Sequence, residues 1–218
     1  MILVTGATGK VGSVAVRALR ARGLPVRALV RSRDRAGALE ETGAEIAEGD
    51  LVVPATLDEA MAGITGVVLV SPAVPAEELN AIDSAARAGV GHVVKMTSKA
   101  SADSPIARRR GQTQIEAGLA ASGIPHTLLR SNAYMQNTLA LAPIIAATSG
   151  FGSSTGPGQV GMVDARDVGE VAAAVAAAPA AHVGRTYWLT GPALITNADV
   201  AATLSRLLRR PVTYRQTT

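Results

Sequence analysis

The chain has 218 residues and 48% of them are hydrophobic, a composition typical of a folded core and not of a disordered chain. Aromatic residues make up only 2% and the net charge is +4, which argues against a nucleic-acid-stacking surface. The chain has no cysteine, so disulfides and thiolate chemistry are excluded. Its three histidines lack metal-ligand spacing, so no metal is expected. Because no apolar run could span a bilayer and no signal peptide precedes the first strand, we expect a cytoplasmic protein.

The first predicted elements are a strand at Ile2–Val4, a glycine-rich turn at Thr5–Ser13 and a helix over Val11–Arg22. Gly6 permits a sharp turn, Gly9 lets the backbone approach a pyrophosphate, and Gly12 allows the helix to pack tightly on the strand. The free N–H groups and the dipole at the start of the helix attract phosphate. This GxxGxxG spacing in a strand–turn–helix context predicts a dinucleotide phosphate site, with an ordinary βα turn as the alternative.

Strand and helix signals then alternate, which predicts a doubly wound parallel sheet of the Rossmann type. The further strands are expected at Val26–Val30, Ala44–Ala47, Gly66–Val70, His92–Met96 and His126–Leu129. The further helices are expected at Arg35–Thr42, Ala55–Ala62, Ala76–Ala88 and Arg108–Ser122. Glycine-containing breakers separate the elements, and two of them, near Gly89 and Gly123, resemble helix C-caps.

Arg31 and Arg33 follow the second strand, where a dinucleotide fold meets the adenosine ribose. An acid there would bind the 2′-hydroxyl of NAD, whereas a guanidinium matches a phosphate in charge and geometry. Together with Lys10 in the glycine turn, Arg31 therefore favours NADP(H) over NAD(H). Surface charge at a strand–helix junction is the alternative interpretation.

The ends of the next three strands carry further candidates. Asp50 could accept from the adenine amino group while Leu51 covers the ring, although Asp50 could equally cap a turn. The loop that contains Ser71 should line the dinucleotide crevice at the carboxyl edge of the sheet. On the fifth strand, alternation puts Lys95 and Thr97 on one face, and the Thr97 hydroxyl is expected to meet the nicotinamide or to cap a turn.

The alternation of strand and helix signals changes after about residue 131. A long apolar segment, Asn132–Thr148, precedes the Gly/Ser/Thr stretch Gly150–Gly158. The remaining predicted elements are a strand near Val160–Val163, a helix over Asp167–Ala178, a strand at Thr186–Leu189, a helix from Thr196 or Asn197 and a strand at Val212–Tyr214. We expect one domain over residues 1–218, with a small substrate lobe interleaved from about 132–160 and 185–218.

Four motifs make the chain resemble the NmrA-like group of atypical short-chain dehydrogenases/reductases, in particular its NAD(P)H:quinone oxidoreductase branch. They are TGATGKVG at 5–12, LVRS at 29–32, the run from VVKMTS at 93 to YMQN at 137, and VDARDVGEV at 163–171. The resemblance implies cofactor contacts at positions that match the family motifs: Gly6, Thr8, Gly9, Lys10, Val11, Arg31, Asp50, Leu51, Ser71 and Thr97. It also implies a loop facing nicotinamide and substrate at 130–137, where we assign Asn132, Tyr134 and Asn137 to substrate binding.

The chain departs from the commonest short-chain reductase pattern. Many such enzymes carry Tyr-xxx-Lys on the fifth helix, where the tyrosine donates a proton and the lysine lowers its pKa. The matching positions here hold Gln112 and Glu116, and no tyrosine occurs between residues 99 and 133. Tyrosine is also lost in the quinone-reducing branch that the chain resembles. We predict Thr97, Gln112 and Tyr134 as catalytic residues, with a packing role for Tyr134 as the alternative.

These observations predict an NADPH-dependent reductase that transfers hydride to a quinone, enone or related carbonyl. Its expected partners are a small-molecule substrate and NADP(H), with no nucleic acid and no membrane. Whether it forms a homodimer is left open. A non-catalytic NADP(H) sensor that binds a protein partner is the alternative, favoured by the missing Tyr-xxx-Lys pair. A nucleotide-sugar enzyme or isomerase is a third interpretation, disfavoured because that chemistry usually needs the missing tyrosine.

Overall fold

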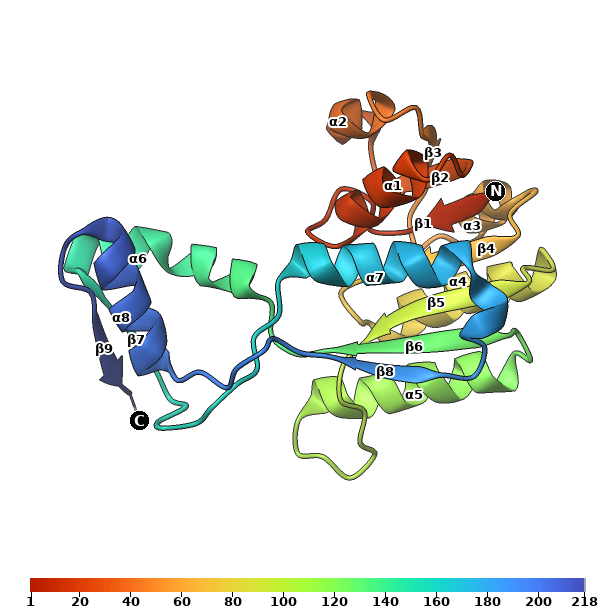
Figure 1. Ribbon diagram of the computed structural model, residues 1–218. Helices are drawn as coiled ribbons and strands as arrows, with labels where there is room; N and C mark the ends of the chain where they lie inside the picture. The colour runs from red at the N-terminus through yellow and green to blue at the C-terminus, as the bar shows by residue number, and fades with distance from the viewer. Residues whose placement is uncertain (218) are drawn as a thin grey trace. The chain divides into compact units, whose positions relative to one another are not determined.

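A computed structural model describes residues 1–217 of the chain, which divide into two compact units (Figure 1). The first unit comprises Met1–Ser131 and Arg166–Trp188. The second comprises Asn132–Ala165 and the described residues from Leu189 onward. The chain therefore leaves the first unit after residue 131, returns at residue 166 and leaves again after residue 188. Within the described residues, no helix is long and apolar enough to cross a membrane.

The first unit is built on a seven-stranded sheet in the order β3-β2-β1-β4-β5-β6-β8. Its strands are β1 (Ile2–Val4), β2 (Val26–Val30), β3 (Glu45–Glu48), β4 (Gly66–Leu69), β5 (His92–Thr97), β6 (His126–Ser131) and β8 (Thr186–Leu189). The five pairings from β3 across to β6 are parallel. The strand order reverses between β1 and β4, the switch point at which parallel sheets of this kind bind ligands.

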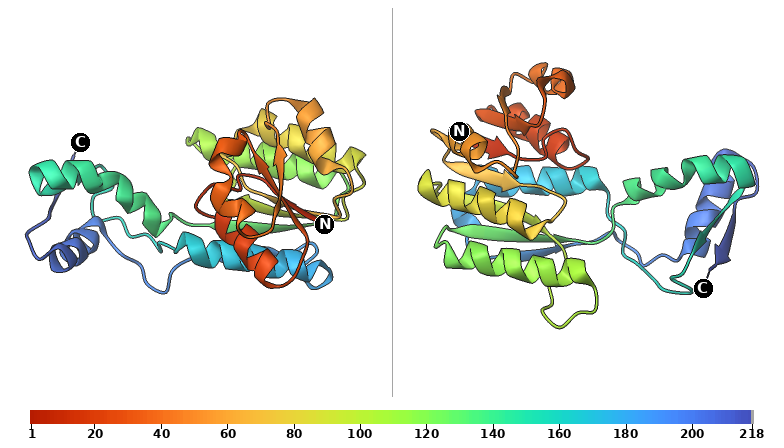
Figure 2. Two further views of the ribbon diagram at one scale, coloured as in Figure 1. Left: turned by 90° about the horizontal axis from the view of Figure 1, so that it is seen from above. Right: turned by 180° about the vertical axis from the view of Figure 1, so that it is seen from behind.

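Helices cover both faces of this sheet. They are α1 (Gly12–Ala21), α2 (Gly37–Glu40), α3 (Pro54–Met61), α4 (Pro75–Arg87), α5 (Ala107–Ala121) and α7 (Ala165–Ala177). Figure 2 shows α1 and α7 on one face and α3, α4 and α5 on the other. This arrangement confirms the predicted doubly wound α/β class.

The main apolar core lies between the sheet and the α3–α4–α5 layer. Its fully buried members include Leu3 of β1, Leu57 of α3, Ile82 of α4, and Ile115 and Leu119 of α5. Burial of each such side chain stabilises the fold by about 1.5–3 kcal/mol. Because these core positions are aliphatic, this face is filled despite the scarcity of aromatic residues.

On the opposite face, α7 lies very close to α1. A Cβ atom added at Gly169 would stand 2.6 Å from Cβ of Val14 and 2.9 Å from the carbonyl oxygen of Val11. The glycine in the VDARDVGEV motif is therefore required for this helix contact, and an ion pair between Arg22 and Glu170 at 3.2 Å supports it at the surface.

The second unit pairs a two-stranded parallel sheet with two helices. Its elements are a 3-10 helix (Met135–Leu141), α6 (Ala142–Thr148), β7 (Gly150–Ser153), α8 (Asn197–Leu208) and β9 (Thr213–Gln216). The core contains Ile145, Phe151, Ala201 and Val212. Thr196 caps α8 in a reciprocal capping box with Asp199, in agreement with the predicted start of this helix.

Three elements differ from the sequence predictions, two in the second unit and one in the first. The strand expected at Val160–Val163 does not form, because Val160 and Val163 make only isolated bridges to Ile195 and Tyr134. The helix expected over Arg35–Thr42 is split into a 3-10 turn (Arg33–Arg35) and the short α2. Strand β7 lies within the Gly/Ser/Thr stretch, where the sequence indicated no strand.

Candidate functional site

The glycine turn after β1 is held against β4. Gly6 has a φ of +55°, and a Cβ atom there would stand 2.7 Å from the carbonyl oxygen of Val70. A Cβ at Gly12 would overlap the carbonyl oxygen of Gly6. The Thr5 hydroxyl locks the turn, since it donates to the Val70 carbonyl at 2.7 Å and accepts from the Val70 N–H at 2.8 Å. The backbone of the turn therefore packs so closely that neither Gly6 nor Gly12 can carry a side chain.

A cavity of about 440 Å³ lies at the switch point of the sheet, beside this turn. It is lined by the turn, by the end of β2, by the residues that follow β2, β3 and β4, and by the first turn of α4. The lining residues are Gly6, Thr8, Gly9, Leu29, Val30, Arg31, Gly49, Asp50, Leu51, Val52, Val70, Ser71, Pro72 and Glu77. A cavity of this size is in the range of small-molecule sites.

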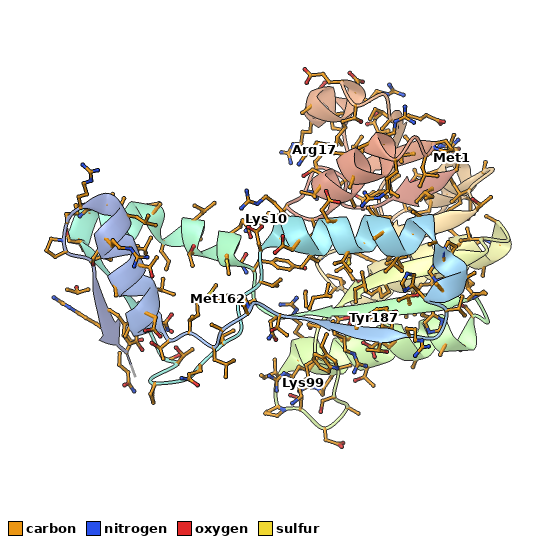
Figure 3. All side chains as sticks on the ribbon, in the orientation of Figure 1. Met1, Lys10, Arg17, Lys99, Met162 and Tyr187 are labelled. Carbon is orange, nitrogen blue, oxygen red and sulfur yellow. The ribbon has the colours of Figure 1, made fainter. Side chains whose placement is uncertain are left out.

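Seven residues predicted to bind a cofactor come together here: Gly6, Thr8, Gly9, Arg31, Asp50, Leu51 and Ser71. Within residues 1–217, Lys10, Val11, Gly12 and Thr97 do not line the cavity. Val11 and Gly12 are buried at the start of α1. Figure 3 shows Lys10 at the carboxyl end of the sheet and Met1 at the opposite end.

The two arginines after β2 have different surroundings. The Arg33 guanidinium donates to the carbonyl oxygen of Ile46 in β3 at 3.1 Å, so it supports the edge of the sheet. Arg31 is exposed and lines the cavity. The geometry thus separates two residues that the sequence presented alike.

Asp50 has one of the two roles that the sequence left open, since it closes a turn, and its contact with adenine stays a prediction. Its Oδ1 accepts from the backbone N–H of Val52 at 3.0 Å, which closes a turn after β3. The same residue lines the cavity beside Leu51. The turn therefore holds the carboxylate in place at the cavity wall.

Beneath Ser71 lies a fully buried ion pair. Nζ of Lys95 on β5 approaches Oε2 of Glu78 on α4 at 2.7 Å, and neither side chain is exposed. In the described chain Oε2 has no hydrogen-bond donor in good geometry, while Oε1 accepts from the Ser71 hydroxyl at 2.5 Å. Burial lowers the pKa of Lys95, and the Glu78 charge opposes that shift.

Thr97 lies at the end of β5, against two residues one turn apart on α5. Its Oγ1 is 2.9 Å from Oε1 of Gln112 and 2.9 Å from Oε1 of Glu116. Glu116 also forms an ion pair with Arg130 of β6 at 2.5 Å, and the Arg130 guanidinium stands 5.4 Å from the ring centre of Trp188. Thr97 and Gln112 are buried. Lys95 and Thr97 contact α4 and α5 respectively, so the two side chains share one face of the sheet, as strand alternation predicts.

Asn132, Tyr134 and Asn137 belong to the second unit, where they begin the segment after β6. Tyr134 forms a backbone bridge to Val163. The nearby Gln136 amide donates to the Asp164 carboxylate at 2.6 Å and accepts from the backbone N–H of Ala165 at 2.9 Å. The substrate assignment of Asn132, Tyr134 and Asn137 stays a prediction.

Sequence reasoning missed part of this site. Glu77 lines the cavity from the first turn of α4, and Leu29 and Val30 line it from β2. The partnership of Glu78 with Lys95 also went unnoticed. A charged lysine in the middle of an apolar strand was the signal that could have indicated a buried partner.

Comparisons with known proteins agree with this architecture. An NAD(P)H azoreductase from Xenophilus azovorans is 38% identical over 218 residues, covering 98% of this chain and 76% of that protein. A (4-alkanoyl-5-oxo-2,5-dihydrofuran-3-yl)methyl phosphate reductase from Streptomyces griseus is 40% identical over 222 residues, covering 99% and 77%. The chain thus spans about three quarters of these relatives.

Among solved structures, the NADPH-dependent quinone oxidoreductase QOR2 of Escherichia coli complexed with NADPH superposes with a TM-score of 0.89. It is 30% identical, and the match covers 100% of this chain and 79% of that one. The NmrA-like family model matches residues 1–218. The chain therefore belongs to the NmrA-like family.

Proposed function

We propose that the chain is an NADPH-dependent reductase that delivers hydride to a quinone, enone or related carbonyl compound. The observation that carries the proposal is the cavity at the switch point, which joins the glycine turn to Arg31. The relatives support it, since their names describe NAD(P)H azoreductase and NADPH-dependent quinone oxidoreductase activities.

The residues around the cavity fit a dinucleotide. The turn has no Cβ at Gly6 or Gly12, where a side chain would collide with backbone, so main-chain N–H groups can meet a pyrophosphate. The exposed Arg31 guanidinium would pair with the 2′-phosphate of NADPH. Asp50 and Leu51 would meet the adenine, and Lys10 would add positive charge at the turn.

NADPH, when bound, supplies the hydride. Reduction of a quinone to a hydroquinone also requires one proton besides the hydride, and solvent can deliver this proton. This requirement matters because Gln112 cannot act as a proton donor and Glu116 is paired with Arg130. We infer that the chain works without a Tyr-xxx-Lys pair and that Thr97 and Gln112 orient the reacting groups. We also propose that Asn132, Tyr134 and Asn137 bind the substrate.

A non-catalytic NADP(H) sensor is the second candidate. It is favoured by the position of Thr97 and Gln112, whose side chains are buried and hydrogen-bonded to each other. Such a protein would keep the cavity and Arg31 but would have no need of a proton donor.

One experiment separates the two candidates. NADPH binding is measured by calorimetry, and NADPH oxidation is followed by absorbance with a panel of quinones, enones and azo compounds. Turnover of at least one acceptor class supports the reductase. Tight NADPH binding with no turnover of any acceptor would overturn it and favour the sensor, whereas no NADPH binding would overturn both.

A further inference from the structure

The hydroxyl group of Ser71 has its proton committed away from the cavity. A serine hydroxyl has one proton and two lone pairs. The Ser71 proton goes to Oε1 of Glu78 at 2.5 Å, and one lone pair accepts the N–H of Ala73 at 2.9 Å. Ser71 lines the cavity, and its hydroxyl oxygen keeps one lone pair and has no proton to offer there.

The direction of the Ser71–Glu78 hydrogen bond depends on Lys95. Nζ of Lys95 lies 2.7 Å from Oε2 of Glu78, and a carboxylate held in an ion pair can only accept hydrogen bonds. Lys95 also donates to the carbonyl oxygen of Met96, which anchors the ammonium group to β5.

The same contacts fix the shape of the loop. Ala73 has a φ of +66°, a left-handed conformation that costs a residue with a Cβ about 1–2 kcal/mol. The N–H group of this residue donates to Ser71, so the strained position is tied to the ion pair through one side chain. Buried ion pairs contribute little net stability compared with apolar residues of similar size. A role in placing the Ser71 oxygen explains the pair better than stability does.

We propose that Lys95 and Glu78 are positioning residues that make Ser71 a hydrogen-bond acceptor at the cofactor cavity. The ligand group that it receives is a donor, such as a ribose hydroxyl or an amino group of the dinucleotide, and not a phosphate oxygen. This inference rests on the proposed binding of NADPH. It adds two residues that lie outside the cavity lining to the determinants of cofactor binding.

The test compares two double variants that both remove the buried charges. Lys95→Met/Glu78→Gln retains an amide oxygen that can accept from Ser71, whereas Lys95→Met/Glu78→Leu offers no acceptor. Calorimetry with NADPH and steady-state quinone reduction are measured for both, together with thermal unfolding. We expect the variant with Gln to bind NADPH within about threefold of the wild type, and the variant with Leu to bind about tenfold more weakly.

The weaker binding should raise the KM for NADPH and leave kcat close to the wild-type value, because the pair does not touch the acceptor. Equal NADPH affinity in the two double variants would overturn the proposal, as would a loss confined to kcat. If the variant with Leu fails to fold, Ser71→Ala removes the acceptor oxygen itself at a partly exposed position, and wild-type NADPH affinity in that variant would overturn the proposal. If the wild-type protein does not bind NADPH, the proposed function itself is refuted. If the wild type binds NADPH and the two double variants bind it equally well, only the role of Lys95 and Glu78 is refuted.

Discussion

The Thr97 hydroxyl and the Glu116 carboxylate lie 2.9 Å apart where the end of β5 meets α5. The same hydroxyl is 2.9 Å from Gln112, but its single proton can serve only one acceptor. The charged carboxylate is the stronger acceptor, so the proton points to Glu116. The Gln112 contact is then satisfied when its amide NH2 group turns toward Thr97, because amide oxygen and nitrogen are interchangeable in shape.

Replacement of this hydroxyl tests the catalytic assignment. We expect Thr97→Val, which keeps the branched shape, to lower kcat for quinone reduction about tenfold, the effect of one lost hydrogen bond worth about 1.4 kcal/mol. Thr97→Ser keeps the hydroxyl and should remain within about threefold of the wild type. Steady-state kinetics at saturating NADPH provide the measurement. A Thr97→Val enzyme with wild-type kcat would assign Thr97 to packing alone.

Arg31 should determine the preference for NADPH over NADH. Arg31→Ala removes the guanidinium at the cavity and should lower the ratio of kcat/KM for NADPH to that for NADH by at least about tenfold, because a charge-assisted contact is worth about 1.5–3 kcal/mol. Arg33→Ala is the matched control, since Arg33 bonds to the Ile46 carbonyl and should leave the ratio unchanged. An unaltered ratio in Arg31→Ala would show that the 2′-phosphate is bound elsewhere.

The close packing of the glycine turn predicts a sharp difference between two glycines. Gly12→Ala should destabilise the protein by several kcal/mol and abolish NADPH binding, because the added Cβ overlaps the Gly6 carbonyl. Gly37→Ala introduces the same methyl group into open space at the start of α2 and should be neutral or slightly stabilising. Urea unfolding with NADPH titration checks both. Equal stability of the two variants would contradict the turn geometry.

Acid should weaken the fold through His92. Its Nε2 lies 3.0 Å from Oγ1 of Thr127, whose own proton goes to the His182 carbonyl, so neutral His92 donates here. Burial, followed by the charges of His126 and His182, lowers the pKa of His92 below its ordinary value of 6.5. The unfolded chain therefore binds more protons than the folded one below about pH 6.5, and stability must fall as the pH drops through that range.

The His92→Gln variant keeps an N–H donor and does not titrate. We expect its free energy of unfolding to change less between pH 7.5 and 5.5 than that of the wild type. Urea denaturation at the two pH values measures this difference. Identical losses in both proteins would refute a role of His92 in the pH dependence.

The sequence predicted the central sheet well because glycine-containing breakers stand between short apolar runs there. Strands β1, β2 and β8 begin and end at the predicted residues. The strand prediction at Val160–Val163 failed for a physical reason, since a short segment forms a strand only when a partner pairs along its length, and this one makes isolated bridges only. β7 was missed because Gly150 and Gly152 pack against β9, a contact between segments about sixty residues apart.

The part of the cavity lining that comes from loops directly after strands was predictable from the sequence. Parallel strands bring those loops to one edge, so Arg31, Asp50 and Ser71 could be expected together. Glu77 and Glu78 were not predictable in this way, because they lie in the first turn of α4 and not in a loop directly after a strand. Their roles depend on the packing of α4 against β5, which no local motif encodes.

The interleaved path of the chain also affects how the protein is made. Strand β8 completes the sheet beside β6, yet it leaves the ribosome only after the first segment of the second unit, Asn132–Ala165. Until then the outer edge of β6 exposes unpaired backbone groups, and α1 lacks the cover of α7. A nascent chain halted near residue 165 should therefore present to chaperones a strand edge that is prone to aggregation. That edge closes once β8 has left the ribosome and paired with β6.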